Sequence, residues 1–223
     1  MTVLTRHLAL LRYLAADLLR AQVFFLPALV FLAVLGMLNS GDPGPPLSAY
    51  QGTALVLYPV AAALTMVICN AEDPVQRQVT LVTARGWGRV LAALVTLAVL
   101  ALLTLIAIAL LVPLVVNPRP QPPSLLLAGA LAHLGSGLLG VALGLLCARP
   151  LLHRPVHAVS TILLGVVLVI FLGRIPPIGN LMTLLEGADG THALGQLALN
   201  VTLSAGLLAA TVALVHALGR KRL

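Results

Sequence analysis

Six long apolar stretches alternate with short polar segments along this chain of 223 residues. Each stretch approaches or exceeds the ~20 residues that a helix needs to cross the hydrocarbon core of a bilayer. They cover residues 21–38, 50–69, 90–116, 124–148, 156–173 and 194–218. The pattern predicts an all-α polytopic membrane protein whose six transmembrane helices form one domain over residues 21–223.

Residues 1–20 predict an amphipathic helix in the membrane interface before the first span. Their apolar side chains recur at helical spacing, and charged residues interrupt them. The apolar face comprises Leu4, Leu8, Leu11, Ala15 and Leu18. The alternative is that residues 1–20 are the polar start of an overlong first span. The same interruptions leave no uninterrupted apolar core for a cleavable signal peptide.

Positive charge gathers on alternate connecting segments. Of the 13 Arg and Lys residues, all but Arg119 and Arg174 lie before the first span, after the second, after the fourth or at the end of the chain. Because loops rich in Arg and Lys remain in the cytoplasm, we expect both termini to be cytoplasmic and three hairpins to face outward.

Composition agrees with a lipid environment. Hydrophobic residues make up 60% of the chain and charged residues 9%, whereas soluble domains carry about 25% charged residues. The net charge of +7 does not indicate a nucleic-acid partner, because the cations lie in short loops beside spans, where they meet anionic lipid head groups. The excess of Arg, Ala and Leu suggests a GC-rich bacterial genome, and hence the bacterial plasma membrane.

The spans offer little catalytic chemistry. His133 is the one ionisable group expected in the middle of a span, and a packing role is favoured over a proton relay. Ser136 and His216 could be compared with an intramembrane serine protease. However, Leu134 departs from the Gly-x-Ser-Gly pattern, and the two residues are expected at heights roughly 10–15 Å apart, too far for a nucleophile and its base.

No cofactor is expected in this chain either. It has no P-loop pattern that would bind a nucleotide. Cys69 and Cys147 are too few for a metal cluster, and both are interpreted as small core residues. We therefore expect a protein that is not itself an enzyme.

Small residues mark one face of the fourth span at four-residue spacing, which lets another helix approach closely. They are Ala128, Ala132, Ser136, Gly140 and Gly144. Packing within the chain is favoured over contact with another subunit.

The third external segment, about 174–190, contains a short apolar piece between Pro and Gly residues. It is too short to span, and we expect it to re-enter the outer leaflet; an ordinary loop is the alternative. Pro176 and Pro177 would stiffen its entry, and Leu181 and Leu184 would supply apolar surface.

The most informative polar segment covers about residues 72–85. Asp73 followed by Pro74 is a typical helix start, and Gly86 is a typical end. A connection that only reverses direction does not require a capped helix of three turns. The segment therefore predicts a docking helix for a cytoplasmic partner, with Val75, Val79 and Val82 on one face and Gln76 and Thr80 on the other.

Together these features resemble the permease subunits of type-2 ATP-binding-cassette (ABC) exporters. The shared features are six spans, an interfacial N-terminal helix, a cytoplasmic helix between spans two and three, and a Pro-rich external segment. Glu72, Arg77, Thr80, Leu81 and Gly86 stand at places comparable to the family's motif. The Glu-Asp-Pro start departs from the family's commoner Glu-Arg-rich start.

The resemblance implies a separate ATPase subunit that carries ATP and Mg, a second permease subunit, identical or not, and transport by alternating access. Partner binding would fall to Glu72, Arg77, Val79, Thr80 and Leu81, with Glu72 positioning the helix.

By analogy with the family, the second and fifth spans would line the substrate pathway, and the external segment would form its outer gate. The polar contacts would be Thr53, Tyr58, Thr65, Ser160 and Thr161. Because no span centre carries Asp, Glu, Lys or Arg, we expect an apolar or amphipathic substrate. The alternative is a membrane scaffold or assembly subunit that binds a cytoplasmic partner without transport.

Overall fold

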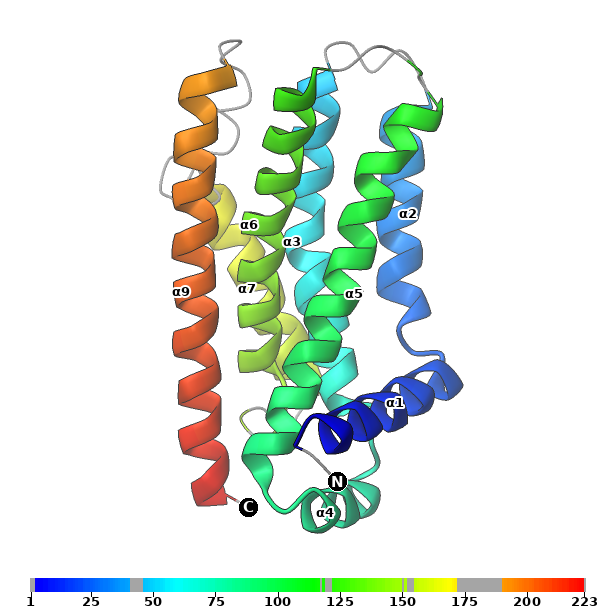
Figure 1. Cartoon of the computed structure of the whole chain (residues 1–223), viewed down its shortest axis with the longest axis vertical. Helices are drawn as coiled ribbons and strands as arrows, with labels where there is room; N and C mark the ends of the chain where they lie inside the picture. Colours follow the sequence, from blue (N-terminus) through cyan, green and yellow to red (C-terminus); the bar gives the residue numbers. More distant parts are fainter. Residues whose placement is uncertain are drawn as a thin grey trace.

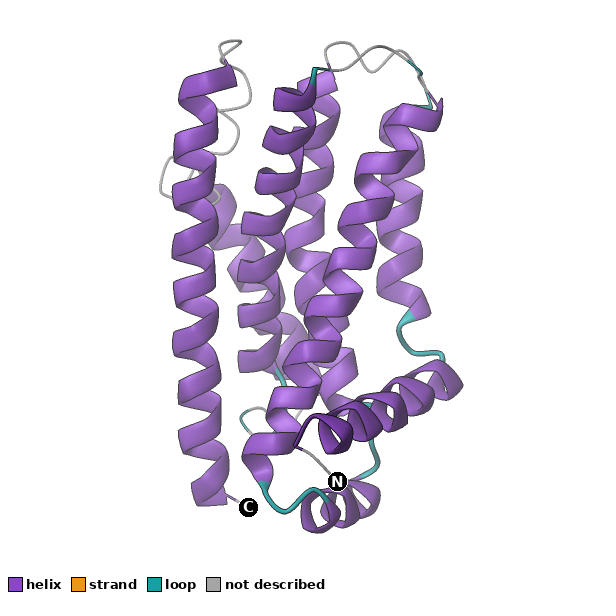
Figure 2. Cartoon of the chain, in the orientation of Figure 1, coloured by secondary structure: helices purple, strands orange, loops and turns teal. Residues whose placement is uncertain are grey.

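The computed structural model describes residues 3–40, 46–116, 118, 122–149, 151, 155–171 and 190–222. Every regular element within these residues is an α-helix (Figure 1, Figure 2). The helices are α1 (Val3–Ala21), α2 (Phe25–Asn39), α3 (Pro46–Asn70), α4 (Pro74–Thr83), α5 (Trp87–Val116), α6 (Pro123–Cys147), α7 (Pro155–Phe171) and α9 (Gly190–Arg222). The prediction of an all-α protein is confirmed.

Four helices are long and apolar enough to cross a membrane. They contain the segments Tyr50–Asn70, Trp87–Val116, Pro123–Cys147 and Ala193–Arg220. Helices α1 and α2 are long and apolar enough to cross a membrane only when they are taken together, as a bent pair. The apolar helix Val156–Leu168 is shorter than the others. The chain is therefore a multi-pass helical membrane protein with four such helices, or five if the bent pair is one span, in the described part. The number six stays a prediction.

The first helix is separate from the second. Gln22 has a φ of 56°, a left-handed conformation that a helix does not accommodate, and the two helices meet at 75°. Helix α1 consequently lies across the end of the bundle while α2 runs along it (Figure 1). An overlong first helix is excluded. Leu14 and Leu18 are buried against the bundle, whereas Leu4 and Leu8 are exposed.

Helix α6 is the central packing element. It contacts α3 and α9 most extensively and also packs on α5 and α7. A Cβ atom added at Gly140 would lie 2.4 Å from the carbonyl oxygen of Tyr58, and one at Gly144 would lie 2.4 Å from that of Ala62. The small-residue face of α6 therefore touches the backbone of α3, which confirms that it packs within the chain.

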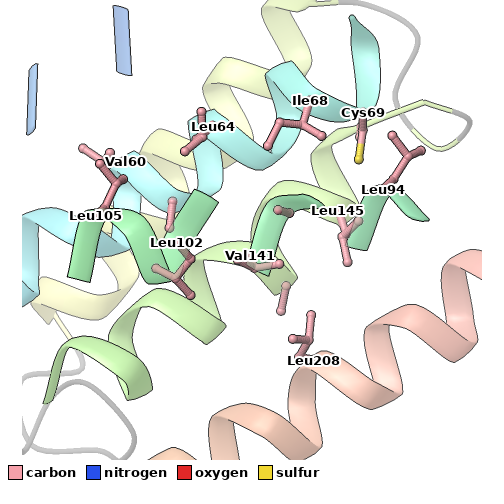
Figure 3. Packing of buried hydrophobic residues seen from close by; sticks show 14 of the residues in the cluster. Val60, Leu64, Ile68, Cys69, Leu94, Leu102, Leu105, Val141, Leu145 and Leu208 are labelled. Carbon is pink, nitrogen blue, oxygen red and sulfur yellow. The ribbon is translucent and has the colours of Figure 1, made fainter. Parts of the chain in front are cut away.

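The largest hydrophobic cluster surrounds this contact. Figure 3 shows Val141 and Leu145 of α6 beside leucines of α5 and α9. Leu102 of α5 fits against Gly137, where a Cβ would meet its Cδ1 atom at 2.3 Å. Cys69 and Cys147 are both free and buried, in agreement with their interpretation as core residues.

The described arginines gather at one end of the bundle. Helices α1 and α4 and the last turns of α9 lie at the same end (Figure 1), which we call the α4 end. The arginines of these elements and of the adjoining connections are Arg6, Arg12, Arg20, Arg77, Arg85, Arg89, Arg149, Arg220 and Arg222. The segments for which the positive-charge pattern predicted a common side therefore meet at a common end.

The close approach of α3 and α6 makes Gly140 sensitive to one methyl group. We expect Gly140→Ala to lower the free energy of unfolding by about 1–3 kcal/mol, because the two helices have to move apart. Labelling of the buried Cys69 and Cys147 by a thiol-reactive dye during heating measures this in detergent. Gly206→Ala is the matched control, since nothing lies within 4 Å of its added Cβ. Equal unfolding temperatures for the two variants would contradict the packing argument.

Candidate functional site

Helix α4 begins and ends as the sequence predicts. Asp73 is the N-cap and its Oδ1 accepts a hydrogen bond from the amide of Val75 at 2.9 Å, and Pro74 occupies the first turn. After Thr83 the chain enters positive φ at Arg85 (60°) and Gly86 (127°), and the Gly86 amide donates to the carbonyl of Leu81 at 3.0 Å. The result is a rigid helix of 10 residues between two membrane-spanning helices.

The outer face of α4 is apolar and accessible. Val75, Val79 and Val82 are 72%, 64% and 81% exposed. They follow the i, i+4, i+7 spacing of one helix face, as predicted. Exposed β-branched residues at adjacent turns form a continuous apolar strip rather than isolated surface residues.

The inner face of α4 is attached to the bundle by polar contacts. The buried Thr80 hydroxyl lies 2.7 Å from Glu72 Oε1, to which it donates a hydrogen bond. Leu81 is half-buried and packs against the largest hydrophobic cluster. Glu72 belongs to the connection just before α4, so this hydrogen bond joins the helix to its own start, and the positioning role of Glu72 stays a prediction.

Gln76 connects α4 to α1. Its Nε2 donates to the Tyr13 hydroxyl at 2.6 Å and to Asp17 Oδ1 at 3.4 Å. The polar face of the N-terminal helix thus contacts the same short helix that contacts the ends of the spans.

Arg77 is buried among several polar and aromatic groups. Its side chain is 8% exposed. It donates from Nη1 to the carbonyl of Cys69 at 3.3 Å and from Nη2 to the carbonyl of Arg149 at 3.1 Å. Its guanidinium carbon lies 5.3 Å from the centre of the Trp87 ring, within the range of a cation–π interaction.

These contacts place a cation where helix ends need one. Cys69 belongs to the last turn of α3, so its carbonyl has no partner within that helix. Arg149 lies two residues beyond Cys147, the last residue of α6. The negative ends of two helix dipoles attract the guanidinium. Burial lowers the pKa of Arg77, and nearby Cys69 and Glu72 oppose that shift; an arginine stays charged in proteins.

Arg77, which was expected to bind a partner, is thus buried in contacts within the chain, and its partner-binding role stays a prediction. Its long side chain reaches inward because two span ends offer carbonyls and Trp87 offers a ring face. Of the five predicted partner-binding residues only Val79 is exposed, and its binding role stays a prediction.

Sequence reasoning missed two residues that complete this junction. Trp87 Nε1 donates to the carbonyl of Val215 in α9 at 3.4 Å, and Asn70 Oδ1 accepts from the Arg149 amide at 3.1 Å. The sequence did offer a signal for both residues, because Asn70 ends α3 and Trp87 begins α5, on either side of α4. At helix ends, polar side chains can bind backbone groups that have no partner within the helix.

The predicted pathway residues of the second span pack against another helix. Thr53, Tyr58 and Thr65 of α3 are buried. Thr53 Oγ1 lies 2.9 Å from Nε2 of His133 in α6, and Nδ1 of that ring lies 2.7 Å from the Gly129 carbonyl. Since the carbonyl requires a donor, Nδ1 carries the proton and Thr53 donates to Nε2. His133 is a satisfied packing residue.

The fifth-span residues lie elsewhere, on α7. Ser160 is exposed and Thr161 is half-buried, and the Thr161 hydroxyl donates to the carbonyl of His157 at 2.7 Å. The structure does not bring them into contact with Thr53. The predicted outer gate of Pro176, Pro177, Leu181 and Leu184, and the re-entrant segment 174–190 except for its last residue, lie outside the described residues.

The structure does not bring Ser136 and His216 together as a catalytic pair. Ser136 is fully buried and donates to the carbonyl of His133 at 3.2 Å. The His216 ring lies beside Gly88 at the start of α5, 2.9 Å from the position of an added Cβ. No three His, Cys, Asp or Glu side chains within the described ranges are grouped so that they could hold a metal ion.

Neither protein-family models, nor curated proteins, nor solved structures give a significant match to this chain.

Replacing Arg77 tests its structural role. We expect Arg77→Met to lower the free energy of unfolding by about 3 kcal/mol, because two buried carbonyls lose a charged donor. Arg12→Met is the matched control, since Arg12 is exposed on α1. Chemical denaturation in detergent measures both variants. If Arg77→Met unfolded like the control, the arginine would not hold the span ends together.

Proposed function

We propose that this chain is the permease subunit of an ATP-driven exporter of the ABC type, and that α4 receives a separate ATPase subunit. The observation that carries the proposal is the strip formed by Val75, Val79 and Val82. It is exposed on a short, capped helix that projects from the end of a membrane bundle. An apolar strip of this kind is stabilised when a partner covers it.

The attachment of α4 suits the transmission of a movement. Arg77 joins it to the ends of α3 and α6, and Gln76 joins it to α1. A displacement of α4 by a partner would consequently reach the central helix pair of the bundle without passing through a flexible connection.

The proposal includes six spans, with both termini and α4 in the cytoplasm of a bacterial cell and the chain in its plasma membrane. Helices α2 and α7 would be the first and fifth spans. The clustering of the described arginines at the α4 end supports this orientation, because Arg-rich segments stay on the cytoplasmic side.

ATP and Mg would bind to the partner subunit, and a second permease subunit would complete the transporter. An apolar or amphipathic substrate fits spans whose centres lack Asp, Glu, Lys and Arg. Because Thr53, Tyr58 and Thr65 pack against α6, a pathway lined by them requires that α3 and α6 separate, or that a second subunit contributes another wall.

The second candidate is a membrane scaffold that binds a cytoplasmic partner and transports nothing. The tight contact of Gly140 and Gly144 with the α3 backbone favours it, because such a contact resists the separation that alternating access needs. The same valine strip would then serve docking alone. ATPase activity that responds to lipophilic compounds distinguishes the exporter from the scaffold.

The docking role of the valine strip can be tested by removing its apolar character. We expect the double variant Val79→Asn, Val82→Asn to co-purify at least tenfold less ATPase after expression of the surrounding operon, since the contact with the partner loses apolar area. Both side chains are exposed, so the fold of the free chain should be unaffected. Lipophilic compounds should stimulate the ATPase activity of the wild-type complex.

The matched control is Val115→Asn, Val116→Asn, which changes two exposed valines at the far end of α5. Normal co-purification with the α4 double variant would overturn the docking proposal. Co-purification of an active ATPase that no lipophilic compound stimulates would favour the scaffold.

A further inference from the structure

We infer that the α4 end contains a discrete binding site for the phosphate of an anionic phospholipid. Helices α1 and α4 and the start of α5 enclose a groove of about 1060 Å³. Arg6 of α1, Arg85 of the connection after α4 and Arg89 of α5 line it. We call it the basic groove.

Charge defines the ligand. Three guanidinium groups, each able to donate paired hydrogen bonds, suit a phosphate, and no acidic residue is among the described residues that line the groove. Arg89 Nη1 also donates to the carbonyl of Ala84 at 3.1 Å, which uses one of the five N–H donors of that guanidinium. The described lining of the groove therefore carries three arginines and no carboxylate.

The apolar part of the groove favours a lipid over a soluble anion. Leu4, Leu10 and Ala92 also line it, and Leu4 is 67% exposed. Ala92 belongs to the first turns of the most hydrophobic spanning helix, so the groove opens at the boundary of the membrane. A phospholipid whose phosphate binds the arginines would place its acyl chains along Leu4 and Leu10.

The end of α4 sets the backbone at Arg85. The amides of Arg85 and Gly86 donate to the carbonyls of Val82 and Leu81, which is the Schellman pattern of a helix end. Arg85 is its left-handed residue, with a φ of 60°, and glycine would adopt this φ without strain. In this conformation Arg85 lines the groove rather than extending α4.

The test compares two triple variants of the full-length protein with the same change in net charge. One is Arg6→Gln, Arg85→Gln, Arg89→Gln. The control is Arg12→Gln, Arg20→Gln, Arg220→Gln, which removes three exposed arginines outside the groove. Native mass spectrometry from mixed micelles measures retention of phosphatidylglycerol relative to phosphatidylcholine.

We expect wild type and the control to retain phosphatidylglycerol selectively. The groove variant should lose about 100-fold in that selectivity, since each arginine contributes about fivefold. Arg85→Gly should lose about fivefold while keeping the fold, because glycine suits the backbone there. Equal losses in both triple variants would mean diffuse attraction and overturn the site. Displacement of the lipid by millimolar inorganic phosphate would reassign it to a soluble anion.

The inference does not depend on the proposed transport function. If the chain retained the lipid selectively but bound no ATPase, the lipid site would stand. Only the exporter proposal would then be contradicted.

Discussion

The rest of the structure depends on the close approach of α3 and α6. The carbonyl oxygens of Tyr58 and Ala62 occupy the space that side chains at Gly140 and Gly144 would need. In a membrane, helices gain little by hiding apolar surface from one another, so short backbone distances and van der Waals contact supply much of the association. The other helices pack around this pair, with Leu102 of α5 against a third glycine of α6.

The ends of that pair are held by a different kind of interaction. Arg77 donates hydrogen bonds to the carbonyl of Cys69 in the last turn of α3 and to that of Arg149 just beyond α6. Glycine packing thus fixes the middle of the bundle, and one buried guanidinium fixes its α4 end. A helix that is only 10 residues long consequently controls the relative position of two spans.

Much of this could be predicted from the sequence, because hydrophobic length and capping are local properties. The span positions of α3, α5, α6 and α9, the Asp73 cap and the valine face follow from spacing alone. The direction of Arg77 could not be predicted, since its acceptors belong to Cys69 and to Arg149, which is 72 residues away. The burial of the proposed pathway residues also depends on a long-range contact, that of α3 with α6.

Trp87 gives the molecule a built-in spectroscopic probe. The chain contains a single tryptophan, and its indole lies against Arg77 of α4 while donating to α9. Any movement of α4 relative to the bundle changes the polarity and the nearby charge around that ring. The intrinsic fluorescence of the unmodified protein therefore reports on the junction directly, without an introduced label and without a background from other tryptophans.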